Sequence, residues 1–480
     1  MSLHEMSNRR ASVIVVVLWA IALAAIVTSA VQLTAFRQAM QGREAFARTQ
    51  TRWAARAGLE DTIAVLADHT FDPIPDDAFA MIYDLEDVAL GEVEGASYEI
   101  LHHVNGRDFK GPMDEHSRFN IHHDSQRGRI MQTFRNMRID IPSSISDWID
   151  DDDEPSTFGV EREYYLSLAY PYEPRNGPMH NMAELELIAG IWPEYVRGED
   201  WNFNNRLDPE ENDGALSLPE DEPDGILEPG WAARLTTFSL AEGATGTGLP
   251  RLELRHATID ELVDRLGVSE RHAEMLIGYG NGSETSLESL YFSPISGTSS
   301  NPASIGQSGS GTQNLGQSSR NSQPSGTPNQ NQGQSQSGSR NQSSGESAMQ
   351  EILPSETVDL ILSETTLNRP YERHPGKMNI NTVEADFLRE MFPDHTDIAD
   401  EIIYLRNSRP QGIVSISELQ DLPEMTDDMF QIMLELFTTT SNIYTVTSRG
   451  ISKASGLEVE MIVVVDRSTL PVRIIEYREQ

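Results

Sequence analysis

The sequence has no cysteine, and it has few basic residues relative to its acidic ones. The absence of cysteine excludes disulfides, zinc–thiolate sites and thiol chemistry. The 480 residues include 36 lysines and arginines against 75 aspartates and glutamates, which gives a formal net charge of -39. Because a strongly acidic surface repels phosphate, we do not expect nucleic acid as a partner, and divalent cations are better candidates.

Patterns typical of catalytic sites are also missing. The sequence shows no Ser-His-Asp arrangement, no phosphate-binding glycine loop and no zinc-type histidine motif. The adjacent pairs His102-His103 and His122-His123 would point to opposite faces of a strand, which argues against joint metal binding by either pair. We therefore do not expect an enzyme.

Long apolar runs are absent except near the N-terminus. Residues 13–31 carry no charge and are numerous enough to cross a bilayer as a helix. No proline follows before Pro73, and the intervening sequence is rich in helix-forming residues. We expect one helix over 13–67, about 80 Å long, with a transmembrane segment at 12–34 and a projecting part at 35–70. A cleaved secretory signal or an ordinary signal anchor is the alternative.

The charges around this apolar run do not fix its orientation. Arg9 and Arg10 precede it, and Arg37, Arg43 and Arg48 follow it, so the count of basic residues does not favour an N-terminus on the inside. We expect that orientation nevertheless, because a large acidic domain after a short tail is usually translocated. The chain would then be a single-pass membrane protein with its C-terminal domain translocated; the resemblance described below implies the inner membrane and the periplasm.

The N-terminal segment resembles type IV pilin-like proteins. A basic leader at 1–11, a small residue, an apolar stretch and an amphipathic helical extension follow one another as in that family. The resemblance implies cleavage by a prepilin peptidase between Ala11 and Ser12, within "RRASVIVVVLW". Most members have glycine in place of Ala11, and glutamate in place of Val16. One subgroup, type II secretion protein K, also has an apolar residue at the place of Val16.

One phrase of the sequence occurs twice. "SRFNIHH" begins at Ser117, and "GKMNINT" begins at Gly376. The similarity extends through three pairs of segments: 119–134 with 378–392, 143–150 with 397–407, and 175–191 with 409–425. Residues 252–280 match the first half of this pattern again. Each copy reads as a strand end, a helix cap, a short helix, a turn and a second helix, followed by a capped helix start. Repeats of this kind resemble helix-hairpin-helix units.

The turns of these units argue against DNA binding. Hairpins that bind DNA present glycine amides to phosphate, whereas "FPDHTD" and "LPEMTDD" contain no Gly-x-Gly. They carry carboxylates instead, at Asp394, Glu424, Asp427 and Asp428. Because carboxylates repel phosphate, we expect these units to serve structural packing.

Four segments have the alternation of strands, at 96–104, 442–451, 457–468 and 471–479. One helix and one early strand cannot cover each other stably, so the last strands are expected to return and pair with the first. The predicted fold class is α+β. It combines a long N-terminal transmembrane helix, a pilin-like antiparallel sheet domain and a large inserted α-helical domain that contains helix-hairpin-helix-like repeats.

The predicted domain boundaries follow from this layout. The pilin-like α/β domain comprises 71–116 and 441–480, and the inserted helical domain comprises 117–292 and 349–440. Residues 293–348 are mostly Ser, Gly, Gln and Asn, with scattered Pro and almost no large apolar residue. This segment cannot offset the entropy of ordering, so we expect a disordered, flexible linker.

The acidic stretch "DWNFNNRLDPEE", at 200–211, has the spacing of a calcium-binding loop. Such loops place oxygen ligands at positions 1, 3, 5, 7, 9 and 12. The corresponding groups are Asp200, Asn202, Asn204, the carbonyl of Arg206, Asp208 and Glu211. Leu207 stands where an inward hydrophobic residue is needed, and Asn205 replaces the usual glycine. Calcium is therefore the predicted structural cofactor, and a solvated acidic loop is the alternative.

Two other stretches are weaker candidates for metal binding. "EDEPDGILEPGW", at 220–231, ends in Trp231 instead of glutamate, so it is expected at most to lend a ligand to the first loop. "DDDDE", at 150–154, crowds carboxylates that need a cation to lie together. A disordered acidic bulge is the alternative for this second stretch.

Several motifs together resemble type II secretion system protein K, the general secretion pathway protein K family of minor pseudopilins. "DWIDDDDEPSTFGVEREYY" (147–165), "PYEPRNGPMHNMAELELI" (171–188) and "MNINT" (378–382) occur in the order of that family. The resemblance covers the leader, the long helix, most of 96–292 and 370–480. It implies a pilin-like α/β domain with a large helical domain inserted into its sheet.

The same resemblance implies a function at the tip of a pseudopilus, in support of protein export across the outer membrane. Other minor pseudopilins are the implied partners. Val16 adds a physical argument. A subunit without a carboxylate at that position cannot pair with the N-terminal amine of another subunit, so it gains little from having one above it. The alternatives are a membrane-anchored helix-hairpin-helix DNA-binding protein and a signal-anchored, calcium-stabilised scaffold protein.

Overall fold

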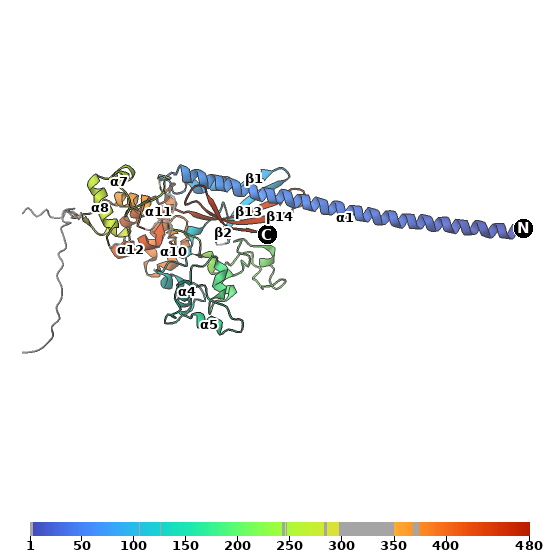
Figure 1. The fold of residues 1–480 in the computed structure, drawn as a ribbon, viewed down its shortest axis with the longest axis horizontal. Coiled ribbons are helices and arrows are strands. Elements are labelled where there is room, and N and C mark those ends of the chain that lie inside the picture. Colours follow the sequence, from blue (N-terminus) through green and yellow to red (C-terminus); the bar gives the residue numbers. More distant parts are fainter. Residues whose placement is uncertain are drawn as a thin grey trace, which may run out of the picture.

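A long N-terminal helix carries a folded body of one main sheet and many short helices (Figure 1). The computed structural model describes residues 3–104, 106–124, 126–241, 245, 247–282, 286–296, 350–367 and 374–480. Helix α1 (Leu3–Phe71) is unbroken and extends far beyond the body, which confirms the continuous helix predicted over 13–67. Among the described residues it is the one helix long and apolar enough to cross a membrane, and its apolar part is not buried in the protein.

An antiparallel sheet forms the part of the body next to α1. Its strands follow the order β1-β2-β13-β14-β15, with β3 pairing β2 and β4 pairing β13. The strands are β1 (Leu90–Val93), β2 (Ala96–Val104), β3 (Arg107–Lys110), β4 (Met113–Asp114), β13 (Ile443–Ser452), β14 (Glu458–Asp466) and β15 (Arg473–Glu479). Strand β13 pairs with β2 in a register that places Arg449 opposite Glu99. The end of the chain therefore returns to its beginning, as predicted, and the fold is α+β.

Helix α1 packs on one face of this sheet in backbone contact. Ser448 donates a hydrogen bond to the carbonyl of Ala55 at 2.7 Å, and a Cβ atom at Gly450 would meet the backbone of α1. The apolar contact between helix and sheet includes Ala54, Leu59, Leu66, Ile100, Val446 and Val463. Because side chains alternate along a strand, Thr447 and Arg449 face the opposite side of the sheet.

The C-terminal end of α1 is held by a buried arginine that follows β14. Arg467 donates from Nη2 to the carbonyl of His69 at 2.8 Å and from Nε to Oγ1 of Thr70 at 2.9 Å. Cations are favourable at the C-terminal end of a helix, where carbonyl groups lack intrahelical partners. This contact fixes where α1 leaves the sheet, before α2 (Ala80–Asp87) begins.

The inserted helical part contains three units of similar construction within the described residues. Each begins with a two-residue strand that pairs in parallel with a two-residue strand at the end of the unit. The first unit contains β5 (Phe119–Asn120), α3 (Arg127–Met131), α4 (Ile141–Ile149), α5 (Arg162–Leu166), α6 (Pro193–Arg197) and β6 (Leu235–Thr236). The second contains β7 (Leu252–Glu253), α7 (Ile259–Leu266), α8 (Glu270–Gly280), β8 (Ile295–Ser296), β9 (Gln350–Glu351), α9 (Ser355–Glu364) and β10 (Thr365–Thr366). The third contains β11 (Met378–Asn379), α10 (Ala385–Met391), α11 (Thr396–Ser408), α12 (Asp427–Leu436) and β12 (Phe437–Thr438).

The phrase repeated in the sequence closes the first and third units in the same way. Asn120 and Asn379 each accept, at 2.9 Å, the backbone amide of the residue two positions further on. Nδ2 of Asn120 donates to the carbonyl of Ser239 at 2.7 Å, and Nδ2 of Asn379 donates to Oγ of Ser441 at 2.7 Å. Each asparagine thus joins the first strand of its unit to the segment after the last strand. The helix-hairpin-helix interpretation of these units stays a prediction.

The first and third units share one hydrophobic core, whereas the second unit has a core of its own. Helices α7 and α8 of the second unit lie at the end of the body farthest from the N-terminus (Figure 1). Antiparallel pairing of β8 with β9 places Ile295 opposite Glu351, so the two sides of the predicted linker lie next to each other. Residues 293–296 of that linker are described, and 295 and 296 belong to β8. Residues 297–348 of the linker lie outside the described residues, as do residues 1 and 2 of the predicted leader.

Candidate metal-binding loop

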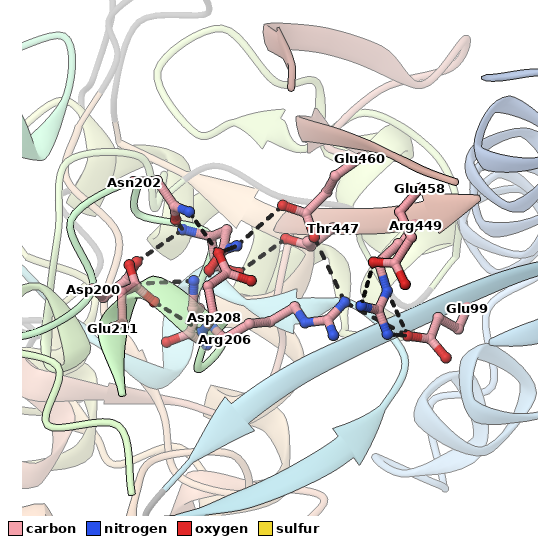
Figure 2. A network of polar contacts seen from close by, with 12 residues as sticks. Glu99, Asp200, Asn202, Arg206, Asp208, Glu211, Thr447, Arg449, Glu458 and Glu460 are labelled. Carbon is pink, nitrogen blue, oxygen red and sulfur yellow. Dashed lines mark hydrogen bonds and ion pairs between the residues drawn. The ribbon is translucent and has the colours of Figure 1, made fainter. Parts of the chain in front are cut away.

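The predicted calcium loop at 200–211 follows α6 and ends in the 3-10 helix η3 (Pro209–Glu211), on the face of the sheet opposite α1 (Figure 2). Its backbone is left-handed at Phe203, with φ of 54°, and at Asn205, with φ of 58°. Asparagine adopts this conformation more readily than most residues. Asn205 therefore fits the position at which calcium loops usually have glycine.

The first and last acidic side chains hold the backbone of this loop. Asp200 accepts two amides of the loop, both at 3.0 Å, and Glu211 accepts two others, at 3.0 and 3.1 Å. Both carboxyl groups are buried, and burial raises the pKa of each to about 7, which the amide hydrogen bonds offset only in part. A cation next to these carboxylates would remove this cost.

Three of the predicted ligand residues meet at the centre of the loop. Nδ2 of Asn202 and Nδ2 of Asn204 each donate to Oδ2 of Asp208 at 2.8 Å. In contrast, the carboxylates of Asp200, Asp208 and Glu211 do not all approach one another within 4.8 Å in the described structure. The structure therefore places the middle three residues together and leaves Asp200 and Glu211 in contact with backbone amides.

The donor set is chemically suited to calcium. Calcium binds six to eight oxygen atoms from carboxylates, amides and backbone carbonyls, and it tolerates irregular geometry. The loop supplies carboxylates at Asp200, Asp208 and Glu211, and it supplies amide oxygens at Asn202 and Asn204. Calcium binding would require the two asparagines to turn their oxygens toward the centre in place of their nitrogens. The two buried carboxylates are the feature of this structure that favours a cation.

The side chain of Arg206 leaves the loop and enters a chain of charges on the sheet (Figure 2). Its Nη1 lies 3.6 Å from Oε1 of Glu99 and 3.6 Å from Oε1 of Glu460. Arg449 in turn forms ion pairs with Glu99 and, at 2.7 Å, with Glu458. Sequence reasoning missed this chain because Glu99 and Arg449 stand 350 positions apart and meet only through strand register.

The loop is a link between the helical part and several strands of the sheet. The amide of His103 on β2 donates to the carbonyl of Asn205 at 3.1 Å, and Nδ2 of Asn205 donates to the carbonyl of His103 at 3.0 Å. Arg478 on β15 donates to the carbonyl of Asn202 at 3.1 Å. A bound ion that restricts the motion of this loop would therefore also restrict the motion of the helical part relative to the sheet.

The second acidic stretch, at 220–231, packs against the first loop. Oε1 of Glu199 accepts the amide of Glu222 at 2.8 Å, and its Oε2 accepts the amide of Glu228 at 3.0 Å. A cavity of about 180 Å³ lies here, lined mainly by acidic and amide side chains: Glu199, Asn202, Asp208, Glu210, Glu211 and Asp221. Trp231 is buried and donates to the carbonyl of Arg135 at 2.9 Å, so it belongs to the core.

The predicted processing residues, Ala11 and Ser12, both lie within α1. Their place in a helix neither requires nor prevents cleavage of the peptide bond between them. Processing by a prepilin peptidase stays a prediction.

Comparison with known proteins gives matches to type II secretion system protein K. Residues 127–198 match the family model for type II secretion system (T2SS), protein K. Type II secretion system protein K of Klebsiella pneumoniae is 34% identical over 53 residues, which cover 11% of this chain and 16% of that protein. The protein of the same name from Pectobacterium carotovorum subsp. carotovorum is 37% identical over 57 residues, or 12% of this chain and 17% of that protein. The matched segments thus span about a sixth of each relative.

One similar solved structure is the GspK-GspI-GspJ complex from the type 2 secretion system of enterotoxigenic Escherichia coli. The similarity covers 92% of this chain and 99% of the matched chain, at 8% sequence identity and with a TM-score of 0.42. The matched family segment, 127–198, contains the helices α3 to α6 of the first helical unit. The family model and both curated relatives agree. This chain is similar to the type II secretion system protein K family, in the family model over residues 127–198 and in short segments of both curated relatives.

Proposed function

We propose that this chain is a minor pseudopilin that caps the tip of a type II secretion pseudopilus and supports protein export across the outer membrane. The matches to type II secretion system protein K support the pseudopilin class. The observation that carries the tip position is the location of the second and third helical units, with α7, α8, α11 and α12, toward the end of the body opposite the N-terminus of α1 (Figure 1). A subunit with this bulk above its sheet leaves little room for another subunit to stack on it.

The residue at position 16 supports the same proposal. Pilin-like subunits resembling this chain use a glutamate there to pair with the N-terminal amine of a neighbour. Val16 is exposed on α1 and offers no charge. A neighbour above this subunit would therefore leave its amine without a carboxylate partner in lipid, where an unpaired charge is costly.

The same proposal places α1 across the inner membrane as a single span, with the body in the periplasm. Prepilin peptidase would process the chain before Ser12, and other minor pseudopilins would be its partners. Helix α1 exposes large apolar side chains beyond the membrane segment, namely Phe36, Met40, Phe46 and Trp53. These side chains suit contact with the corresponding helices of neighbouring subunits.

Labelling of pseudopili tests the tip position directly. Because the chain has no cysteine, Glu274→Cys on α8 would introduce a unique and exposed thiol for gold particles. We expect one labelled end on each fibre in the native host, and no label on fibres with the cysteine-free chain. Label distributed along the fibres would contradict the tip position. Mass spectrometry of the mature N-terminus separates this proposal from an ordinary signal anchor, since processing requires a start at Ser12.

We also propose that calcium binds the loop at 200–211 as a structural ion. Its ligands would be the set predicted from the sequence: Asp200, Asn202, Asn204, the carbonyl of Arg206, Asp208 and Glu211. The buried carboxylates of the loop and its oxygen-only donor set support this proposal. Because the loop contacts β2, β14 and β15, the ion would fix the helical part on the sheet.

A further inference from the structure

The second helical unit, from β7 to β10, is attached to the rest of the body by two connections that lie side by side. Its first and last strands pair with each other, so the unit begins and ends at one place. The two connecting segments pair as well. The amide of Ala241 donates to the carbonyl of His374, and the amide of Gly376 donates to the carbonyl of Ser239, both at 2.9 Å. The covalent attachment of the unit therefore passes through one narrow strip of two segments.

This strip is held closely against the rest of the body. A Cβ atom at Gly376 would lie 2.8 Å from a backbone nitrogen of the facing segment and 2.8 Å from Cε1 of His116. His116 is buried, and its Nδ1 donates to the carbonyl of Lys377 at 2.8 Å. Four positions before β7, a Cβ atom at Gly248 would lie 2.8 Å from the carbonyl oxygen of Phe71 at the end of α1. The connected side of the unit is therefore fixed in place.

The apolar contact between the second and third units is small. Each unit packs around a different core, and Tyr291 contacts both cores. The ring of Phe430, which is buried on α12, lies 5.4 Å from the ring of Tyr291 and 5.9 Å from the ring of Phe292. Because stabilisation by burial follows the apolar area removed from water, a contact of three rings holds the unit far less firmly than its own core holds it together.

Polar side chains complete the contact between these two units. Glu288, in the 3-10 helix η5 (Glu288–Tyr291), forms an ion pair with Lys377. Oγ of Ser417 in the third unit donates to Oδ2 of Asp359 on α9. The side chains of Lys377 and Glu288 are 25% and 26% exposed, so water and salt reach the ion pair. Pairs of this kind are screened by salt and stabilise a contact only weakly.

We propose that the second helical unit is a hinged module, which rotates as a rigid body about the paired segments 239–241 and 374–376 and so separates η5 and α9 from the third unit. Small and polar contacts between parts of one chain permit such relative motion. Because the unit has its own core, it keeps its structure when the contact opens.

The rotation has two consequences for the molecule. It exposes the ring of Phe430, which is 2% exposed in the structure described here. It also moves α7 and α8, which lie at the end of the body farthest from the N-terminus, relative to the sheet (Figure 1). The rotation needs no assembly partner and does not depend on the tip position.

Pulsed electron paramagnetic resonance between two spin labels tests this motion on the full chain in detergent. Because the chain has no cysteine, Glu274→Cys on α8 and Glu401→Cys on α11 provide two exposed attachment points. We expect a main distance and a second, minor distance. Glu288→Gln combined with Ser417→Ala should increase the minor population by about fivefold, which is the effect of losing an exposed ion pair.

Two controls accompany this measurement. Glu92→Gln removes an ion pair of the sheet, with Lys453 at 2.6 Å, and should leave both populations unchanged. Labels at Glu163→Cys on α5 and Glu401→Cys report on units that share one core, so their single distance should not respond to the double substitution.

Hydrogen exchange separates rotation of the unit from its unfolding. The amides of α8 should stay protected in the protein with Glu288→Gln and Ser417→Ala, and loss of that protection would overturn the proposal. A single distance between positions 274 and 401 that is the same with and without the double substitution would also overturn it. Should the doubly substituted protein fail to fold, the otherwise unchanged labelled chain in about 1 M salt, where the ion pair is screened, decides by the same distances.

Discussion

A Cβ atom at Gly450 on β13 would lie 2.0 Å from the carbonyl oxygen of Thr51 on α1. It would also lie 2.9 Å from the backbone nitrogen of Ala55, so the helix and the strand are in direct backbone contact. Neither contact atom belongs to a flexible side chain that could move aside. The position of the long helix on the sheet therefore depends on the absence of a side chain at this residue.

Gly450→Ala is expected to push α1 away from the sheet and to lower the free energy of unfolding by about 2–3 kcal/mol. Chemical denaturation of the detergent-solubilised chain, followed by near-ultraviolet circular dichroism, measures this loss. Gly42→Ala is the matched control, because it lies in the same helix with nothing within 4 Å of the added Cβ. That control should stabilise the protein by up to about 1 kcal/mol, and equal effects of the two changes would refute the packing argument.

Local signals were sufficient to predict the long helix and the strands. The alternation at 96–104 coincides with β2, and the three C-terminal strands lie within two residues of their predicted starts. The return of these strands to the sheet of β2 was predicted because one helix and one early strand cannot cover each other stably. These features depend on near neighbours in the sequence or on simple burial.

The remaining features depend on contacts between distant residues. The pairing of Glu99 with Arg449 requires strand register, and the approach of Glu161 to Asp147 requires the closure of a loop. The parallel strand pairs that close the helical units have two residues each, which is too short for any periodicity to reveal. The sequence predicted the ligand spacing at 200–211, but it could not predict that Asp200 and Glu211 would contact amides of the backbone.

Asn379→Ala is expected to destabilise the third helical unit. Asn379 is buried, and truncation would leave Oγ of Ser441 and one backbone amide without their present partner. Unsatisfied buried groups of this kind cost about 1–3 kcal/mol each. Asn407→Ala, at an exposed position of α11, should change stability by less than about 0.5 kcal/mol. Thermal unfolding measures both, and a similar loss in Asn120→Ala would show that the repeated phrase has one structural role.

Acid is expected to destabilise the protein through His122. Burial and the charge of Arg127 lower the pKa of His122 to about 4, and its Nε2 accepts the amide of Met179 at 2.9 Å. Because the unfolded chain binds this proton at a higher pH, the stabilisation is complete above about pH 6.5 and declines as the pH falls toward 4. The decline should reach about 1–3 kcal/mol.

Denaturation curves between pH 7.5 and pH 4 measure this decline. His122→Gln should be less stable at neutral pH but should lose less stability on acidification, because glutamine has no proton to gain. His180→Gln, at an exposed position, should keep the slope of the unchanged protein. A slope that is identical in all three proteins would show that His122 is not the group responsible.

Removal of calcium should destabilise the attachment of the helical part through the loop at 200–211. Chelator should lower the melting temperature of the protein when measured at pH 8. An ion at a hundred times its dissociation constant contributes about 2.7 kcal/mol. Asp200→Ala should abolish the response of the loop, whereas Glu274→Ala, on the exposed face of α8, should leave it unchanged.

The pH dependence of that response distinguishes an ion from other effects of the chelator. Without an ion, the pKa of Asp200 and that of Glu211 are about 7, above their ordinary values, so the ion-free protein gains stability as these groups become protonated below pH 7. Protons also compete with calcium for the same oxygens. The effect of chelator should therefore be larger at pH 8 than at pH 5.5, and a response of equal size at both values, or none at pH 8, would contradict calcium binding by this loop.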